Sequence, residues 1–143
     1  MTIEVELVRE VTDELVEAFG RLLPQLSTSA PQLDARALAA IATWQGNNLL
    51  VARIDGVIVG ALTLVVFPIP SGTRARIEDV VVDTAARGTG VGSTLTQEAL
   101  GIARELGART VDLTSRPTRE AANRLYERMG FARRDSSVYR KVP

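Results

Sequence analysis

The stretch "VVVDTAARGTGVGSTL", residues 80–95, constrains the fold more than any other part of the chain. It passes from three valines, which favour a strand, through a loop with Gly88, Gly90 and Gly92 into an amphipathic helix. Glycine reaches positive φ without a steric penalty and lets another molecule approach the backbone closely. A loop that ends a strand and begins a helix also gathers unpaired amides at the positive end of the helix dipole. The stretch therefore predicts a phosphate-binding turn.

Two well-known glycine-rich phosphate motifs do not fit this loop. The dinucleotide fingerprint G-x-G-x-x-G needs a third glycine where Ser93 stands. The Walker loop needs four residues between its glycines, followed by Gly-Lys-Ser or Gly-Lys-Thr, and that run is absent. The spacing that is present is Arg87-x-x-Gly90-x-Gly92, for which an ordinary tight strand–helix turn is the structural alternative.

The residue types that the chain lacks exclude several kinds of catalytic and metal-binding site. The chain has no histidine and no cysteine, which excludes disulfides, thiolate nucleophiles, imidazole bases and the commonest zinc and iron ligands, so we expect no metal. Seventeen basic residues balance seventeen acidic ones, and no overall field favours nucleic acid or a membrane surface. No apolar segment approaches the roughly 20 residues of a membrane helix, and the N-terminus does not resemble a secretory signal. We expect a cytoplasmic protein without nucleic-acid or membrane partners.

A length of 143 residues with 45% hydrophobic residues predicts one domain over residues 1–143. Period-two patterns predict strands at residues 3–7, 49–55, 57–67, 75–83, 110–115, 131–135 and 137–142. Helical periodicity and caps predict helices at residues 12–26, 33–44, 95–106 and 117–129. The turn Asp55-Gly56 predicts a hairpin, and residues 68–73 a loop. This order indicates an α/β fold, α+β in some schemes, with a mixed sheet and helices on both faces.

Three sequence features together resemble the GNAT superfamily of acyl-CoA-dependent N-acyltransferases. They are the Arg87-x-x-Gly90-x-Gly92 loop, the preceding "VVVD" and the downstream "AANRLYERMGF". Chain length and element order agree with that fold from end to end. The resemblance implies a bacterial-type single-domain member with a mixed, mostly antiparallel seven-stranded sheet, four helices on both faces, and splayed strands four and five.

The same resemblance implies acetyl-CoA as cosubstrate, lying between strands four and five. Pantetheine would bond to strand four as a short extra strand does, and the diphosphate would lie over the amides of the glycine loop. Many members place an asparagine seven residues before the tyrosine of the last helix; Arg119 stands there instead and would reach a phosphate. The implied cofactor-binding residues are Val80, Val81, Val82, Arg87, Gly88, Thr89, Gly90, Val91, Gly92, Ser93 and Arg119.

Acyl transfer to an amine needs a base and a proton donor, because an alkylammonium with a pKa near ~10 must lose a proton and the departing thiolate must gain one. By resemblance, Glu78 is the expected base and Asp79 holds the acceptor, although either could be a plain strand-end acid. Alternation along a strand brings only one of them to the acceptor unless a bulge intervenes. Tyr126 resembles the family's general acid, with an aromatic core role as the alternative. A backbone N–H near Val81 would polarise the thioester carbonyl.

The expected acceptor is a small-molecule primary amine. Its site would be formed by the two loops "LSTSAP" and "FPIPSGTR", with Trp44 either in the site or in the core. Residues that could line the site are Ser27, Thr28, Trp44, Phe67 and Arg74. Arg74 and Arg76 would suit a phosphate or carboxylate on the acceptor. Members that act on protein N-termini often carry a glutamate where Thr114 stands, which argues against a ribosomal-protein substrate.

Two other functions are compatible with the loop. A non-catalytic acyl-CoA-binding or sensing module would keep the loop and need no base, and a nucleotide or phosphosugar binder would use it for another phosphate. A homodimer also remains open, since closing strands such as "SVYRKV" pair across dimers in related proteins.

Overall fold

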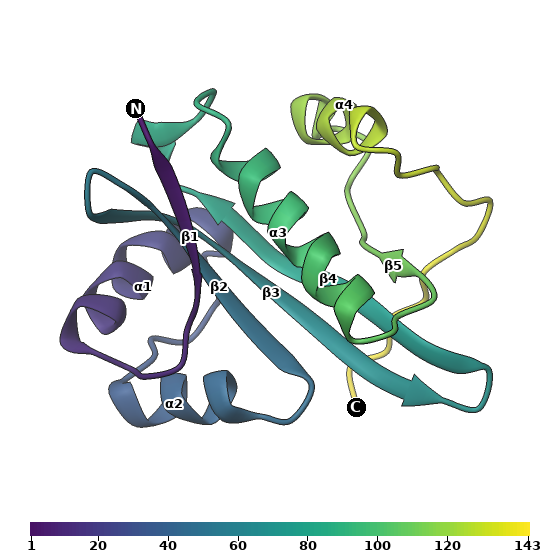
Figure 1. Cartoon of the computed structure of the whole chain (residues 1–143), viewed down its shortest axis with the longest axis horizontal. Helices are drawn as coiled ribbons and strands as arrows, with labels where there is room; N and C mark the ends of the chain where they lie inside the picture. Colours follow the sequence, from purple (N-terminus) through teal and green to yellow (C-terminus); the bar gives the residue numbers. More distant parts are fainter.

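A computed structural model describes residues 1–143. The strands are β1 (Ile3–Leu7), β2 (Asn47–Ile54), β3 (Val57–Ile69), β4 (Gly72–Val82) and β5 (Val111–Asp112). The helices are α1 (Asp13–Leu26), α2 (Ala35–Thr43), α3 (Val91–Glu105), α4 (Glu120–Arg128) and a short 3₁₀ helix η1 (Thr84–Ala86). The five strands form one sheet in the order β1-β2-β3-β4-β5, antiparallel except for the parallel pair β4–β5 (Figure 1).

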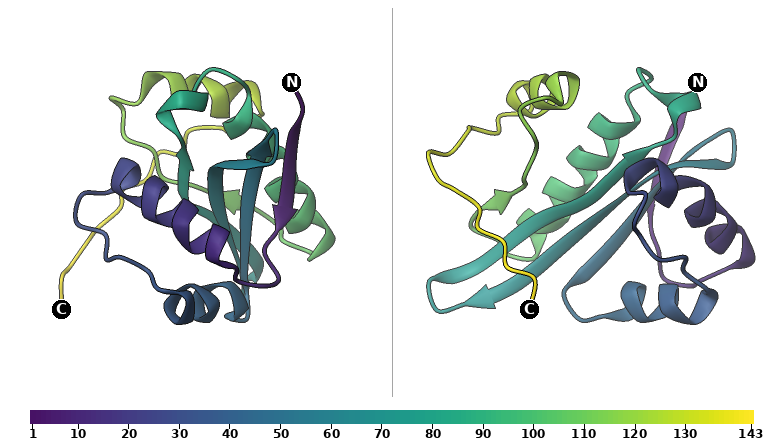
Figure 2. Two further views of the ribbon diagram at one scale, coloured as in Figure 1. Left: turned by 90° about the vertical axis from the view of Figure 1, so that its left-hand side faces the viewer. Right: turned by 180° about the vertical axis from the view of Figure 1, so that it is seen from behind.

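Helices cover both faces of the sheet, as the sequence predicts. One core cluster joins α1 and α2 to the sheet and includes Leu22, Leu38 and Val51. The other joins α3 to the opposite face and includes Leu50 and Leu95. Because neighbouring residues of β2 alternate between the two clusters, the strand is buried on both sides and its sequence is almost continuously apolar. Figure 2 shows the two layers edge-on.

Local signals place the first two helices. Thr12 caps α1 by accepting a hydrogen bond from the Leu15 amide at 3.2 Å, and Asp34 caps α2 by accepting from the Ala37 amide at 2.8 Å. None of the helices combines the length and the apolarity that crossing a membrane requires. Trp44, predicted either in the core or in the acceptor site, ends α2 with 71% of its surface exposed.

The loop predicted at residues 68–73 is wrong. β3 continues to Ile69 and β4 begins at Gly72, so only Pro70 and Ser71 form the turn. Gly72 has a φ of +125°, a conformation that glycine adopts readily, which lets the two strands stay paired up to the turn. The result is a long hairpin arm that projects from the sheet (Figure 1).

The predicted closing pair of strands at residues 131–135 and 137–142 is also wrong, and the sheet has five strands rather than seven. Residues 132–143 are exposed throughout and adopt neither helix nor strand. The strand predicted at 110–115 shortens to the two residues of β5. Such a short edge strand offers few backbone groups to a further strand, so the alternating pattern of the C-terminal segment finds no partner.

Gly60 determines how closely α3 approaches the sheet. A Cβ atom at this buried glycine of β3 would lie 2.8 Å from Val91 Cγ1 and 3.2 Å from Leu95 Cδ1. The first turn of α3 therefore rests on bare backbone. This contact places the N-terminus of α3 directly beside the end of β4.

Candidate functional site

The turn before α3 presents a run of unpaired backbone amides. No hydrogen bond within the chain is donated by the amides of residues 88–93. On one side the Arg87 amide donates to the Thr84 carbonyl oxygen at 3.4 Å, and on the other the Thr94 amide donates to that of Gly90 at 3.0 Å. Gly90 is the N-cap of α3 and has no side chain, so no side-chain hydrogen bond caps this helix end.

The glycines of the turn have different roles. Gly88 and Gly90 have φ values of +78° and +94°, where other residues are strained. Gly92 lies in the first turn of α3, where a Cβ atom would be 3.5 Å from Leu125 Cδ2 and 3.9 Å from Val82 Cγ2. The same small residue thus brings together β4, α3 and α4. Arg87 is exposed beside the turn.

The strands next to the turn separate. β5 pairs with β4 only at Ala75↔Val111 and Arg76↔Asp112, while β4 continues to Val82 with β3 on its other side. The edge of β4 from Ile77 onward is therefore not paired with β5. The fourth and fifth strands thus pair at two positions and then separate, which is the expected splaying. The backbone of Val80–Val82 lies beside the gap.

Tyr126 lies on α4 with 8% of its surface exposed. Its ring packs edge-on against Phe131 with 5.7 Å between the ring centroids. Burial raises the pKa of the Tyr126 phenol above its ordinary value, and the positive charge of Arg119 partly offsets this. The hydroxyl thus stays protonated at neutral pH and can donate a proton or a hydrogen bond. Arg119, at the N-cap of α4, lies close enough to influence that proton.

A β-bulge brings Glu78 and Asp79 to one face of the sheet. The register passes from Ala61↔Val81 to Thr63↔Glu78, so β4 carries one residue more than β3. Asp79 has a φ of +50°, which fits the extra residue. The bulge reverses the alternation of β4. Ile77 packs under α3, whereas Val81, four residues later, packs under α1 and α2. Sequence alone could not locate this bulge, because Asp and Val at its centre carry no turn signal.

Asp79 borders a small cavity on the α1–α2 face. The cavity has a volume of about 60 Å³, and its other lining residues are Phe19, Leu23, Leu33, Leu38, Ile41, Leu49, Ala61, Thr63 and Val81. Asp79 reaches solvent, but burial against these apolar groups raises the pKa of its carboxyl, and the neighbouring negative charge of Glu78 raises it further. Glu78 instead faces Arg76, with 3.4 Å between Oε2 and Nε.

Of the predicted acceptor loops, the one between β3 and β4 lies apart from these acids. Arg74 pairs with Phe67, four residues along β4 from Glu78, which corresponds to roughly 13 Å. Arg74 donates to Thr110 Oγ1 at 3.3 Å and to Ser71 Oγ at 3.1 Å. Ser27 and Thr28 follow the end of α1, and neither they nor Trp44 line the Asp79 cavity.

Arg76 is the cation nearest the acids along β4. Besides its contact with Glu78, its Nη2 donates to Thr114 Oγ1 at 3.1 Å. Thr114 therefore occupies the far side of the site as a hydrogen-bond acceptor for an arginine. Alternation puts Arg74, Arg76 and Glu78 on the same face of β4.

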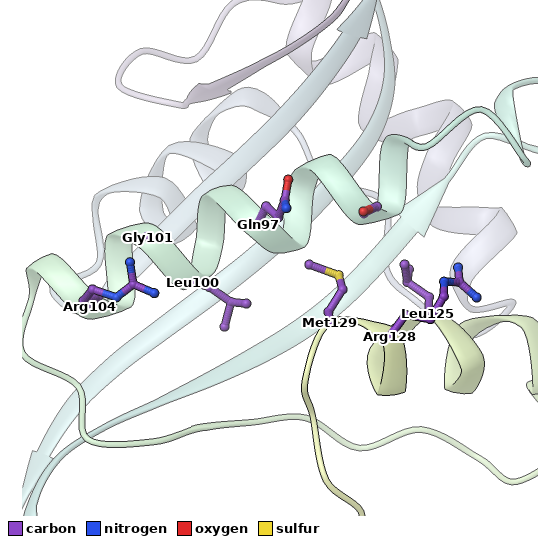
Figure 3. A pocket seen from close by; sticks show the side chains of 8 residues that line it. Gln97, Leu100, Gly101, Arg104, Leu125, Arg128 and Met129 are labelled. Atoms are coloured by element: carbon purple, nitrogen blue, oxygen red, sulfur yellow. The ribbon is translucent and has the colours of Figure 1, made fainter.

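A second cavity, of about 590 Å³, lies between α3 and α4 (Figure 3). It is lined by Ser93, Gln97, Leu100, Gly101, Arg104, Leu125, Arg128 and Met129. Ser93 belongs to the run of free amides and Leu125 adjoins Tyr126, so this cavity opens from the turn itself. Arg104 and Arg128 give it positive charge.

One buried polar side-chain atom has no partner in the chain. It is Ser115 Oγ, in the segment that links β5 to α4. This hydroxyl and the six amides of residues 88–93 are polar groups for which the chain itself supplies no partner. No group of three or more potential metal ligands occurs in the chain.

The sequence profile of the Acetyltransferase (GNAT) family matches residues 7–131. The chain belongs to this family. The resemblance carried by the Arg87 loop and the Tyr126 helix is thereby confirmed, and the protein is an acyltransferase.

One curated relative and two solved structures are similar to this chain over most of its length. A glucosamine 6-phosphate N-acetyltransferase from Trypanosoma brucei brucei is 36% identical over an alignment of 140 positions that covers 92% of each chain. The crystal structure of an acetyltransferase from Trypanosoma brucei has a TM-score of 0.80 and 28% identity, over 99% of this chain and 100% of that one. A Bacillus halodurans structure described as a transcriptional regulator has a TM-score of 0.81 and 29% identity, with the same coverage.

Proposed function

We propose that this GNAT protein transfers an acetyl group from acetyl-CoA to the primary amine of a small molecule, with both substrates bound at once. The observation that carries the proposal is the run of unpaired amides at residues 88–93, which lies beside an unpaired strand edge. Backbone donors at a helix N-terminus bind a diphosphate without a matching positive side chain. Beside the gap, the unpaired edge of β4 offers backbone hydrogen bonds to pantetheine.

The bulge supports Asp79 as the base for the acceptor amine. Its carboxylate has a raised pKa, which makes it a stronger base than an ordinary aspartate, and it borders the cavity on the acceptor side. Glu78, the residue favoured by the resemblance, is held by Arg76. We assign proton removal to Asp79 and give Glu78 the role of orienting Arg76 and the ammonium group.

Tyr126 completes the reaction as the proton donor. The amine nitrogen forms a bond to the acetyl carbonyl carbon as the carbon–sulfur bond breaks; Asp79 takes the proton that the amine loses, and Tyr126 gives one to the departing sulfur. The raised pKa of Tyr126 keeps this proton in place until it is needed. A backbone N–H near Val81 would stabilise the carbonyl oxygen, an effect worth roughly 3 kcal/mol in comparable sites.

Arg76 supports an acceptor that carries an anionic group as well as an amine. On one face of β4 the order is acid pair, Arg76, Arg74, so two positive side chains follow the acids along the strand, the first of them in contact with Glu78 at 3.4 Å. An amino-sugar phosphate carries both a positive amine for the acids and an anionic group for an arginine. The activity named for the Trypanosoma brucei brucei relative, on glucosamine 6-phosphate, supports the same acceptor class.

Calorimetry and kinetics test the proposal together. We expect coenzyme A to bind the wild-type protein and amino-sugar phosphates to be acetylated. Tyr126→Phe should lower kcat by ~10²-fold with CoA affinity unchanged, because it removes one proton donor and nothing that holds the cofactor. CoA binding without turnover of any amine would favour a sensing module, and absence of CoA binding would contradict the donor assignment.

A further inference from the structure

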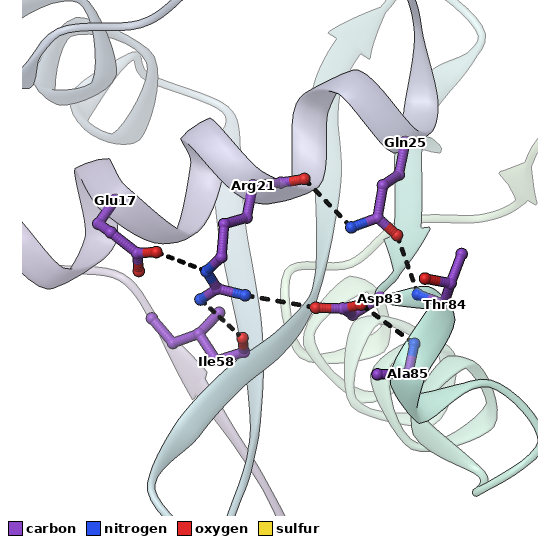
Figure 4. Close-up of polar contacts among 7 residues, drawn as sticks. All are labelled: Glu17, Arg21, Gln25, Ile58, Asp83, Thr84 and Ala85. Atoms are coloured by element: carbon purple, nitrogen blue, oxygen red, sulfur yellow. Dashed lines mark hydrogen bonds and ion pairs between the residues drawn. The ribbon is translucent and has the colours of Figure 1, made fainter.

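Two side chains of α1 hold the segment that leads into the turn of free amides (Figure 4). Arg21 donates through Nη1 to Asp83 Oδ2 at 3.3 Å and through Nη2 to the carbonyl oxygen of Ile58 at 3.3 Å. Gln25 lies one helical turn later. Its Oε1 accepts a hydrogen bond of 2.9 Å from the Thr84 amide, and its Nε2 donates to the Arg21 carbonyl oxygen at 3.1 Å. Two successive residues of the segment are thus bonded to one helix.

The segment is also tied to β3, because the Asp83 amide donates to the Val59 carbonyl oxygen at 2.8 Å, and Ala86 is buried. The bonds from α1 add side-chain contacts from the other layer. η1 has only three residues and begins at Thr84. No backbone carbonyl accepts a hydrogen bond from the Thr84 amide. Asp83 uses its second carboxylate oxygen to accept from the Ala85 amide at 3.1 Å. The free amides begin at Gly88, four residues after Thr84, and Gly88 and Gly90 have positive φ values that other residues adopt only with strain. The contacts from α1 at residues 83–84 therefore act on the start of the segment that carries these amides.

The opposite side of α1 faces the acceptor cavity. Phe19 and Leu23 line the cavity that Asp79 borders. Residues 19 and 23 lie on a different face of the helix from residues 21 and 25, since four residues make one turn and two residues make about half a turn. One rigid helix therefore contacts both the acceptor cavity and the approach to the donor turn.

We propose that Gln25 and Arg21 are positioning residues for the donor site, which hold the amide turn in the orientation that binds the diphosphate. This inference rests on the proposed function. The two residues touch neither substrate and act through residues 83 and 84. Because Asp83 is only 18% exposed in its side chain, the Arg21 contact is better shielded from solvent than a surface ion pair.

The test compares two replacements of Gln25 of similar size. Gln25→Met removes both hydrogen bonds, whereas Gln25→Glu keeps an oxygen that can accept from the Thr84 amide. We expect Gln25→Met to weaken CoA binding in calorimetry about 5- to 20-fold, the equivalent of one or two hydrogen bonds. Gln25→Glu should stay within about threefold of wild type, and kcat at saturating acetyl-CoA should change little in both.

Arg53→Gln is the matched control. Arg53 also ties α1 to the sheet, through Glu14 at 2.8 Å and Glu6 at 3.0 Å, but at the other end of the helix. The Arg53→Gln substitution should lower Tm and leave CoA affinity unchanged. In a double-mutant cycle, Arg21→Gln and Asp83→Asn should be non-additive for CoA binding, as expected for groups in contact.

The outcomes separate this inference from the proposed function. If wild type binds CoA and Gln25→Met binds it equally well, or if Arg53→Gln weakens binding as much, Gln25 and Arg21 do not position the turn. If wild type does not bind CoA at all, the proposed donor is wrong. Hydrogen exchange of the Thr84 amide then still tests the anchor: exchange in Gln25→Met no faster than in wild type would overturn it.

Discussion

Asp79 lies in a strained and partly apolar environment, and the same environment suits it to act as a base. Its positive φ strains the backbone, while burial beside the apolar cavity, and then the negative charge of Glu78, raise the pKa of its carboxyl. A group whose pKa is higher in the folded than in the unfolded state destabilises the fold once the pH rises through the folded value. Such a residue is typical of functional sites, where local strain is compensated elsewhere in the structure.

Asp79→Asn should therefore gain stability and lose activity. At pH 7 we expect a higher Tm than for wild type, and below pH 3.8, the ordinary aspartate pKa, we expect no gain, because wild type is then protonated too. Loss of a general base should lower kcat/KM by ~10²-fold or more. Thermal unfolding at both pH values and steady-state kinetics measure the two effects.

The wild-type pH profile provides the complementary check. Its acid limb should lie at higher pH than an ordinary aspartate would give, because kcat/KM falls as Asp79 becomes protonated. Glu98→Gln, an exposed acid on α3, is the control and should keep the wild-type profile. A profile for Asp79→Asn with the same acid limb as wild type would show that another group is the base.

Arg76 is the residue whose change should alter acceptor selectivity. Arg76→Gln removes the positive charge next to Glu78 and keeps a hydrogen-bonding group for Thr114. We expect KM for an amino-sugar phosphate to rise about tenfold, as for the loss of one charged hydrogen bond, while KM for the same sugar without phosphate changes by less than about twofold. Equal effects on both acceptors would contradict a role in anion recognition.

At the scale of elements, the site depends on how α3 meets the sheet. The amides of the turn are free because α3 begins at a glycine without a side-chain cap, and they lie beside β4 because Gly60 lets the first turn approach closely. The bulge in β4 likewise brings the two acids, Glu78 and Asp79, to one face of the sheet. Both devices are local departures from regular structure, placed next to the gap between β4 and β5.

Gly60→Ala should weaken donor binding without altering any polar group of the site. The added methyl would lie 2.8 Å from Val91 Cγ1, and valine cannot move aside easily, so α3 must shift. We expect a loss of about 1–3 kcal/mol in the free energy of unfolding and weaker CoA binding. Chemical denaturation and calorimetry measure these. Gly20→Ala, on the exposed side of α1 with open space around its Cβ position, should neither lower the stability nor weaken CoA binding.

The whole molecule consists of two apolar cores separated by one sheet, and the donor turn lies where the α3 layer and the end of β4 meet (Figure 2). α1 belongs to the other layer but reaches residues 83–84 through Gln25 and Arg21. Donor binding should therefore stabilise both layers together rather than the α3 layer alone.

Thermal unfolding with CoA checks this. At a concentration of 100 times Kd, a ligand that binds only the folded state adds about 2.7 kcal/mol to its stability. For a domain of this size we expect Tm to rise by about 5–12 °C in a single transition. Two transitions, of which only one shifts, would show that the layers unfold independently. ATP or NAD giving an equal shift would favour the nucleotide-binding alternative.

Much of the site could be read from the amino-acid order alone. Gly88, Gly90 and the following helical pattern predict unpaired amides because positive φ and helix ends are local properties of the backbone. Tyr126, Arg87 and the acid pair could be named because they lie at fixed spacings within a family pattern. The two errors in the sheet, the loop at 68–73 and the closing strands, arise because alternation shows that a segment can be extended, and only a partner strand makes it part of a sheet.

The sequence by itself determined the backbone conformations that need no distant partner: the glycine turn, the caps at Thr12 and Asp34, and the faces of the helices. Only the tertiary structure decided that β4 gains a residue at Asp79, that α3 rests on Gly60 and that α1 binds residues 83–84. These are contacts between segments tens of residues apart, and their energies depend on packing that no local pattern contains.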